Sequence, residues 1–265
     1  MYLLQADETN VEASQGNFFI YGGVVLPVSR LRDVHDAVER VRKKYGFAAE
    51  DQFKFNTHTR PAEMSVADWT AAKAEVLERA SELDVDLIIY VVHHGIAAGA
   101  DAGTRMSYAL NALIAHFDLR YLSEKGSHGI VSLDRLDEAF GYGYLRSRFQ
   151  SPLDLPDGRS PSLERVLHYS MTCDGASHVS SLVDIAIGAV RYCVNTAAGK
   201  GRDDVAQKMF PAIAQLMWHK MRGDVMKVGG YGFLMYPKVI RSPFYKEQYD
   251  ELIKTLERYG STGDD

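Results

Sequence analysis

The chain has 265 residues, of which 46% are hydrophobic and 25% are charged, and its formal net charge at pH 7 is −5. This composition is typical of a globular protein that can bury a substantial core. Apolar stretches such as 87–92 fall far short of the roughly 18 residues that a membrane span needs. The start turns acidic too early for a signal peptide, and Cys173 and Cys193 form no cysteine framework, so we expect a cytoplasmic protein without a membrane partner.

The first half of the chain alternates predicted strands with predicted helices. Apolar and aromatic runs indicate the strands, and hydrophobic residues three and four positions apart indicate the helices. Gly22 and Gly23 lie inside the second strand and indicate a bulge or a close approach. Ser29 and Ser65 are candidate N-caps, and Asp68 after Ser65 completes a pattern similar to a capping box. The predicted elements are strands at 2–6, 18–26, 52–57 and 85–93 and helices at 30–46 and 66–83.

The second half contains longer helices. They are predicted at 104–124, 177–195, around 205–222 and at 244–259, with strands at 129–133 and 167–172 and an extended piece at 225–236. Strands that alternate with long helices predict a mixed α/β sheet that is covered on its faces. We expect one domain with a core at 1–195, a helical C-terminal extension at 196–259 and a disordered tail at 260–265.

The helix predicted at 177–195 carries an unusual carboxylate. Residues 179–190 are largely apolar and contain one ionisable group, Asp184. Burying a carboxylate is costly unless a cation or several donors meet it. Helical spacing places Ser177, Ser181 and Gly188 on the same stripe as Asp184. These small residues predict room for a ligand in front of Asp184.

Two further acidic residues follow predicted strands. Asp7, with Glu8 behind it, ends the first strand, and Asp134 ends the strand at 129–133. Binding crevices open at the carboxyl ends of strands in covered α/β sheets. Three carboxylates suit Mg²⁺ or Mn²⁺, and two such ions would activate water and stabilise the leaving oxygen in phosphodiester cleavage. The alternative for each Asp is a turn former or a helix cap without a function in binding.

Short motifs along the first 190 residues resemble those of one family. The sequence Asp-Glu-Thr at 7–9 resembles the Asp-Glu-Ser opening of the uncharacterised DUF3800 proteins, and the glycine-flanked strand at 21–25 is similar to their second strand. Phe-Lys-Phe at 53–55 is similar to their Glu-x-Lys-Phe segment. Residues 181–189 resemble their carboxyl-terminal Gln-x-x-Asp-x-x-x-Gly-Ala helix, with Ser in place of Gln.

The resemblance implies a ribonuclease H-like mixed β-sheet flanked by α-helices, an acidic metal site and a nuclease activity. In ribonuclease H-like enzymes the acidic residues commonly come from the first strand, the strand beside it and the last helix. Here the strand at 85–92 ends in His93 and His94 instead of a carboxylate. Asp134, Asp51 or a histidine is therefore the candidate for the remaining ligand, and a histidine would favour Mn²⁺ or a later transition metal. The alternative is that the two histidines only lie at the mouth of the strand.

Lys54 and the segment at 140–149 are candidates for contacts with nucleic acid. Alternation along the predicted strand points Lys54 away from its aromatic neighbours, toward Asp7, a scissile phosphate or solvent. The segment interleaves aromatic residues with two arginines, a composition that suits single-stranded nucleic acid. A glycine-broken loop that packs its rings on the core would have the same sequence. The candidate contacts are Tyr142, Tyr144, Arg146 and Arg148.

The sequence therefore predicts a Mg²⁺- or Mn²⁺-dependent nuclease. Its predicted catalytic residues are Asp7, Glu8, Asp134, Asp184 and Lys54, and its predicted metal ligands are Asp7, Asp134, Asp184 and Asp51. The alternative is a catalytically inactive ribonuclease H-like scaffold that binds nucleic acid or a protein partner. The methionine-rich C-terminal helix at 205–222 is a candidate surface for a partner or for a homo-oligomer.

Overall fold

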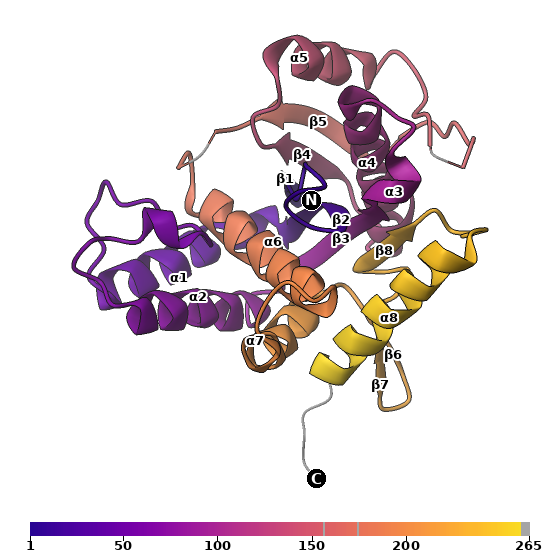
Figure 1. Cartoon of the computed structure of the whole chain (residues 1–265). Coiled ribbons are helices and arrows are strands. Elements are labelled where there is room, and N and C mark those ends of the chain that lie inside the picture. Colours follow the sequence, from indigo (N-terminus) through magenta and orange to yellow (C-terminus); the bar gives the residue numbers. More distant parts are fainter. Residues whose placement is uncertain (156, 174, 261–265) are drawn as a thin grey trace.

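A mixed six-stranded β-sheet forms the centre of the computed structural model, which describes residues 1–155, 157–173 and 175–260 (Figure 1). The strand order is β5-β4-β1-β2-β3-β8. β2 runs antiparallel to β1 and β3, whereas the pairs β1–β4, β4–β5 and β3–β8 are parallel. The carboxyl ends of β1, β3, β4, β5 and β8 therefore share one edge of the sheet. The strands are β1 Tyr2–Thr9, β2 Phe18–Pro27, β3 Asp86–His93, β4 Gly129–Leu133, β5 Val166–Met171 and β8 Phe233–Tyr236.

Helices cover both faces of this sheet, which confirms the predicted mixed α/β architecture. On one face α1, α2, α6, α7 and α8 bury their apolar stripes, and on the other α4, the π-helical segment η3 and α5 do so. Figure 1 shows α6 between the α1–α2 pair and α8. The helices are α1 Leu31–Lys44, α2 Val66–Ser81, α3 His94–Ala97, α4 Ala102–His116, η3 Phe117–Leu122, α5 Glu138–Ser147, α6 His178–Ala197, α7 Asp203–Leu216 and α8 Pro243–Gly260.

α6 lies along β1 with the two elements running in the same direction. Two side-chain hydrogen bonds show this direction. Gln5 Nε2 donates to Ser180 Oγ at 2.7 Å, and further along both elements Asn10 Nδ2, directly after β1, donates to Asn195 Oδ1 at 2.8 Å. The helix begins where Ser177 Oγ accepts from the Ser180 N–H at 3.2 Å. The middle of α6, which contains Asp184, is therefore placed opposite the end of β1.

The two glycines of β2 permit a close approach and not a bulge. The pairing of β1 with β2 is continuous from Tyr2 to Thr9, so the predicted bulge is wrong. A Cβ at Gly22 would collide with the Ile89 side chain, and one at Gly23 would press on the Gln5 carbonyl. The close approach expected of these positions is confirmed, and it adjoins Asp7, the ladder partner of Gly22.

Local signals predicted several boundaries correctly. The strand predicted at 129–133 is β4, and Ser65 caps α2 by accepting from the Asp68 N–H at 3.0 Å. Ser29, in contrast, is not an N-cap. It lies in the short 3-10 turn η1, Val28–Arg30, and α1 follows Arg30 without a side-chain cap.

Three predicted segments differ in the structure. Residues 52–57 do not form a strand but lead irregularly into the 3-10 turn η2, Thr57–Thr59, because the Phe55 N–H bonds to Asp184 and not to a neighbouring strand. Residues 140–149 lie mostly in α5 and not in a loop, since Asp137 caps this helix at the Phe140 N–H. The helix predicted to reach 222 ends at residue 216 and is followed by the hairpin of β6 Lys220–Arg222 and β7 Val225–Lys227.

The C-terminal extension contributes a strand as well as helices. β8 lies within the extended piece predicted at 225–236 and pairs with β3. α7 and α8 pack into the same apolar core as α6. Residues 196–259 thus complete the core that 1–195 begin. Gly260 ends α8, and the rest of the predicted tail, 261–265, lies outside the described residues.

Candidate functional site

Three candidate carboxylates from three elements meet at one edge of the sheet. Asp7 lies within β1, which runs three residues further than the predicted strand at 2–6. Ala6 pairs with Leu133, and the Asp134 N–H donates to the Ala6 carbonyl at 2.8 Å, so Asp134 follows β4 directly beside Asp7. Asp184 approaches from α6 and lines the same cavity as Asp7. The structure therefore brings these predicted site residues together.

Burial and mutual repulsion raise the pKa of two carboxyl groups in this acid cluster, which we define as Asp7, Glu8, Asp134 and Asp184. Burial, followed by the charges of its three acidic neighbours, raises the pKa of Asp7 to about 8, although the Glu8 N–H donates to Asp7 Oδ1 at 2.7 Å. Burial and the charge of Asp134 raise the pKa of Glu8 to about 7. Shifts in this direction arise where carboxylates are close together and poorly hydrated. The cluster therefore behaves as one electrostatic unit.

The segment before η2 holds Asp184 in place. The Phe55 N–H donates to Asp184 Oδ2 at 2.5 Å. Lys73 of α2 holds Phe55 in turn, because its Nζ donates to the Phe55 carbonyl at 3.1 Å and lies 4.4 Å from the ring centroid. Burial lowers the pKa of Lys73 to about 8, an effect that the negative charge of Asp184 partly opposes.

Gly188 accommodates Phe55, so this end of the stripe is filled. The other end leaves the predicted room for a ligand, because Ser177, Ser181 and Asp184 line a cavity. A Cβ at Gly188 would collide with the Cβ and ring of Phe55. The absence of a side chain at this position therefore lets the aromatic residue pack on α6 one turn beyond Asp184. The same contact keeps the Phe55 N–H directed at the carboxylate.

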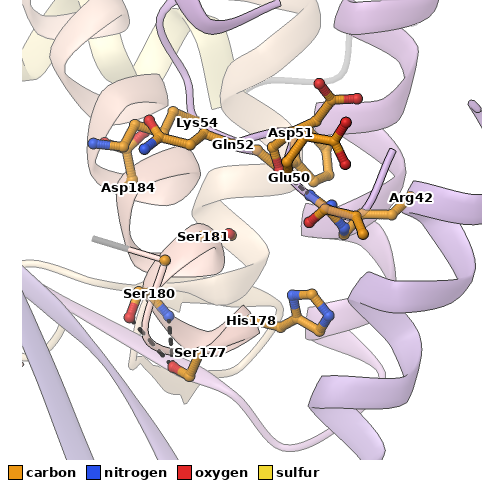
Figure 2. Close-up of a pocket in the computed structure, with 13 residues that line it drawn as sticks. Arg42, Glu50, Asp51, Gln52, Lys54, Ser177, His178, Ser180, Ser181 and Asp184 are labelled. Atoms are coloured by element: carbon orange, nitrogen blue, oxygen red, sulfur yellow. Dashed lines mark hydrogen bonds between the residues drawn. The ribbon is translucent and has the colours of Figure 1, made fainter. Parts of the chain in front are cut away.

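Two cavities adjoin Asp184 and Lys54, which line both of them. Figure 2 shows the first, of about 230 Å³, between residues 49–54 and the first turns of α6. The second has about 300 Å³ and is lined by Asp7 and Glu8 as well. Lys54 therefore lies beside the acid cluster, although residues 52–57 are not the strand from which its direction was predicted.

One buried polar atom of the cluster and one beside it have no hydrogen-bond partner among the residues that the structure describes. They are Glu8 Oε2 and the hydroxyl of Tyr21, a fully buried side chain. Glu8 and Tyr21 are ladder partners of β1 and β2, and alternation puts both on the face opposite to that of Asp7. Unsatisfied buried polar atoms are rare in folded proteins. These two provide unused hydrogen-bonding capacity for a ligand or water.

The donor types of the acid cluster suit a hard divalent cation, because carboxylate oxygens are the ligands that Mg²⁺ and Mn²⁺ prefer. Within residues 1–155, 157–173 and 175–260, no group of three or more His, Cys, Asp or Glu side chains is placed to hold a metal ion. Binding an ion would therefore require side-chain movement in the cluster. The unpartnered Glu8 Oε2 is one atom that could contribute.

The histidines at the end of β3 are engaged in packing. His93 accepts the Gly95 N–H at Nδ1, 3.0 Å away, and its Nε2 lies 2.7 Å from Gln248 Oε1. His94 Nε2 lies 2.9 Å from the Asn10 carbonyl. Both side chains are buried, and burial lowers the pKa of each. The structure therefore does not direct them at the acid cluster, and the alternative of a histidine ligand is not supported by it.

Asp51 closes a local turn and does not join the cluster. Its Oδ2 accepts the Ala48 N–H at 2.6 Å, and its carbonyl accepts from Arg42 Nη1 at 2.8 Å. Asp51 lines the cavity of Figure 2 but not the cavity that contains Asp7. Its predicted role as a metal ligand therefore has no support from its position.

Two of the four predicted nucleic-acid contacts are structural. The Tyr144 hydroxyl donates to Asn111 Oδ1 at 2.7 Å. The Arg148 guanidinium lies 4.2 Å from the Tyr144 ring centroid and donates to the same Asn111 oxygen at 3.2 Å. These contacts fasten α5 to α4. Tyr142 and Arg146 are exposed on the outer side of α5.

The chain matches no protein-family model, and a comparison with curated proteins gives no match. In the part of the chain that the structure describes, no helix has the length and apolar character needed to cross a membrane. The resemblance to the DUF3800 proteins therefore stays a prediction, and the site is interpreted from its own geometry.

Sequence reasoning missed Lys73 and Arg191. Lys73 lies on the apolar stripe of α2, between Trp69 and Val76, and a lone charge on such a stripe is a usable signal. Arg191 follows Asp184 by seven residues, or two helical turns, which places both on one side of α6. The role of Phe55 had no comparable signal, because it depends on a hydrogen bond to a residue 129 positions away.

Proposed function

We propose that this chain is a metal-dependent phosphodiesterase that cleaves nucleic acid and has a ribonuclease H-like sheet. The observation that carries the proposal is the meeting of Asp7, Asp134 and Asp184 at one sheet edge, where burial and neighbouring charges raise the pKa of Asp7 to about 8. Gathering acidic groups in a partly dry site destabilises the folded protein. Strongly perturbed carboxylates of this kind cluster at functional sites, where a cation or a substrate offsets the repulsion.

The origin of the acidic residues supports the ribonuclease H-like part of the proposal. Such enzymes commonly take them from the first strand, the strand beside it and the last helix. Asp7 lies in β1, and Asp134 follows β4, which pairs with β1. Asp184 lies in α6, the helix that follows β5, and the chain adds α7 and α8 after it. The strand that ends in His93 is β3, two positions from β1 on its other side. Its missing carboxylate therefore does not count against the proposal.

The residues of the site would take different chemical roles. A bound divalent cation would supply charge neutralisation and an activated water. Asp7, Asp134 and Asp184 would hold it, and Glu8 would add a ligand or accept a proton from the attacking water. Lys54, which lines both cavities, would bind a non-bridging phosphate oxygen.

Thermal unfolding of wild type and Asp184→Asn, each with and without Mn²⁺, tests this proposal together with cleavage of an oligonucleotide. At a metal concentration about 100 times Kd, the wild type should gain about 2.7 kcal/mol of stability, and Asp184→Asn should gain nothing. Cleavage should fall by orders of magnitude in the variant. Asp250→Asn, on the exposed side of α8, is the matched control and should retain both responses. A wild type that responds to neither Mn²⁺ nor Mg²⁺ contradicts the proposal.

A second candidate function is a catalytically inactive scaffold of the same fold that binds nucleic acid or a protein. One observation favours it, namely that no ready-made metal-binding group is present in the described ranges. In that case Mn²⁺ changes nothing, and wild type and Asp184→Asn bind a single-stranded oligonucleotide equally without cleaving it.

A further inference from the structure

The cavity beside the acid cluster has a distinct end formed by hydrogen-bond donors. It lies between α6 and residues 54–59 and has a volume of about 300 Å³. On β1, Thr9 lies two residues beyond Asp7, and on α6, Arg191 lies two turns beyond Asp184. Because β1 and α6 run in the same direction, both steps lead to the same side of the acids. Asn56, His58 and Thr59 line this cavity as well.

Arg191 is the principal cation of this end. Its Nη1 donates to Thr9 Oγ1 at 3.3 Å, and its guanidinium lies 5.9 Å from the Phe55 ring centroid. The side chain is half-buried, and among the described residues it makes no ion pair with a carboxylate. A guanidinium group carries five N–H donors. The Thr9 contact uses one of them, so most of the group is available to a ligand in the cavity.

We propose that this cavity binds a phosphate group of the substrate, one nucleotide unit away from the bond at the acid cluster, with Arg191 as the anchoring side chain. The inference rests on the proposed function for the identity of the substrate. Guanidinium groups bind phosphate through two parallel hydrogen bonds, and the Thr9 hydroxyl and Asn56 amide can supply further donors. Two residues of β1, about 7 Å, separate Thr9 from Asp7. That length matches one repeat of an extended single strand.

The cavity has room for one phosphate group together with its sugar, given its volume of about 300 Å³. The phosphate bound by Arg191 is either a terminal phosphate or an internal phosphate of the backbone. A terminal and an internal phosphate would be bound by the same hydrogen bonds. Comparing a probe that carries a terminal phosphate with one that lacks it distinguishes the two.

Binding measured without divalent metal separates this inference from the proposed function. The probe is a short fluorescent single-stranded oligonucleotide, with or without a terminal phosphate on the unlabelled end, titrated by anisotropy in EDTA. Arg191→Gln should weaken binding about 10- to 100-fold and lower the slope of log affinity against log salt by about 0.7. Arg191→Lys should recover part of the loss. Arg32→Gln removes an equal charge at the opposite sheet edge, in an exposed pair with Asp36, and should bind as wild type does.

The outcomes are decisive in either direction. Loss confined to the phosphorylated probe identifies a terminal phosphate, and equal loss for both probes identifies an internal phosphate. Unchanged binding by Arg191→Gln, equal weakening by Arg32→Gln, or no binding by the wild type at low salt would overturn the inference. The binding assay contains no divalent metal and requires no cleavage. Its result therefore does not depend on whether the protein binds Mn²⁺.

Discussion

Asp7→Asn should stabilise the metal-free protein, and the gain should grow with pH. The folded-state pKa of Asp7, about 8, lies above its ordinary value of 3.8, so the folded protein holds this proton more tightly than the unfolded chain does. The stability that this tightly held proton contributes is complete below about pH 4 and is lost as the pH rises toward 8. The shift corresponds to about 5–6 kcal/mol as an upper bound, shared with the coupled Glu8. Asparagine keeps the shape of the side chain and removes the repelled charge.

Urea denaturation in EDTA, from about pH 5 to about pH 9, measures this effect. The free energy of unfolding of wild type and Asp7→Asn should differ little at the acidic end. Above neutral pH the variant should be more stable by several kcal/mol, and Mn²⁺ should stabilise the wild type alone. Asp250→Asn removes an exposed carboxylate paired with Lys246 and should change stability by less than about 1 kcal/mol at every pH. If Asp7→Asn is less stable than wild type throughout, the carboxylate is a structural partner and the reasoning is refuted.

Four further substitutions test three separate features. Gly188→Leu should destabilise the folded protein by about 3 kcal/mol and abolish Mn²⁺ binding, because the new side chain displaces Phe55. Calorimetry with and without metal measures both effects. Unchanged stability and metal binding would mean that Phe55 does not pack against Gly188. Burial lowers the pKa of His116 to about 4, so the stability that the neutral imidazole contributes is lost as the pH falls from about 6.5 to about 4. In His116→Gln the free energy of unfolding, measured by urea titration, should therefore fall by up to about 3 kcal/mol less over this pH range than in wild type. Arg148→Ala should lower stability by about 1–2 kcal/mol and Arg146→Ala by less than about 0.5 kcal/mol, a contrast that denaturation midpoints would reveal.

Elements whose signals are local were predictable from the sequence. The strand at 129–133 is bounded by Gly129 and an aspartate, and Ser65 and Asp68 carry their capping interaction within one turn. Residues 52–57 carry an equally plausible strand pattern that failed. The backbone donor of Phe55 is taken by a side chain on α6, and no pattern within the segment could indicate that competitor.

The acid cluster was partly predictable, for a topological reason. Aspartates that follow parallel strands reach the same sheet edge, and the pairing of β4 with β1 places Asp134 directly beside Asp7. Asp51 has the same chemistry, but it follows no strand and its carboxylate closes the turn at Ala48. A carboxylate in a loop finds backbone N–H groups nearby, whereas one at the end of a parallel strand is carried toward other strand ends. Predictions of acidic sites should therefore weigh the element that precedes the residue above the residue type.

The basic end of the cavity depends on the direction in which a helix crosses the sheet. Asp184 and Arg191 share a side of α6, yet the sequence does not specify whether the step from one to the other leads toward or away from the end of β1. The contacts Gln5–Ser180 and Asn10–Asn195 fix that direction. The first joins residues in the first half of each element, and the second joins the residue directly after β1 to the end of α6. With α6 reversed, Arg191 would lie over the start of β1, far from Thr9. The same residues at the same spacing would then offer no cation beside the acids, so the candidate phosphate site is a property of the packing between β1 and α6.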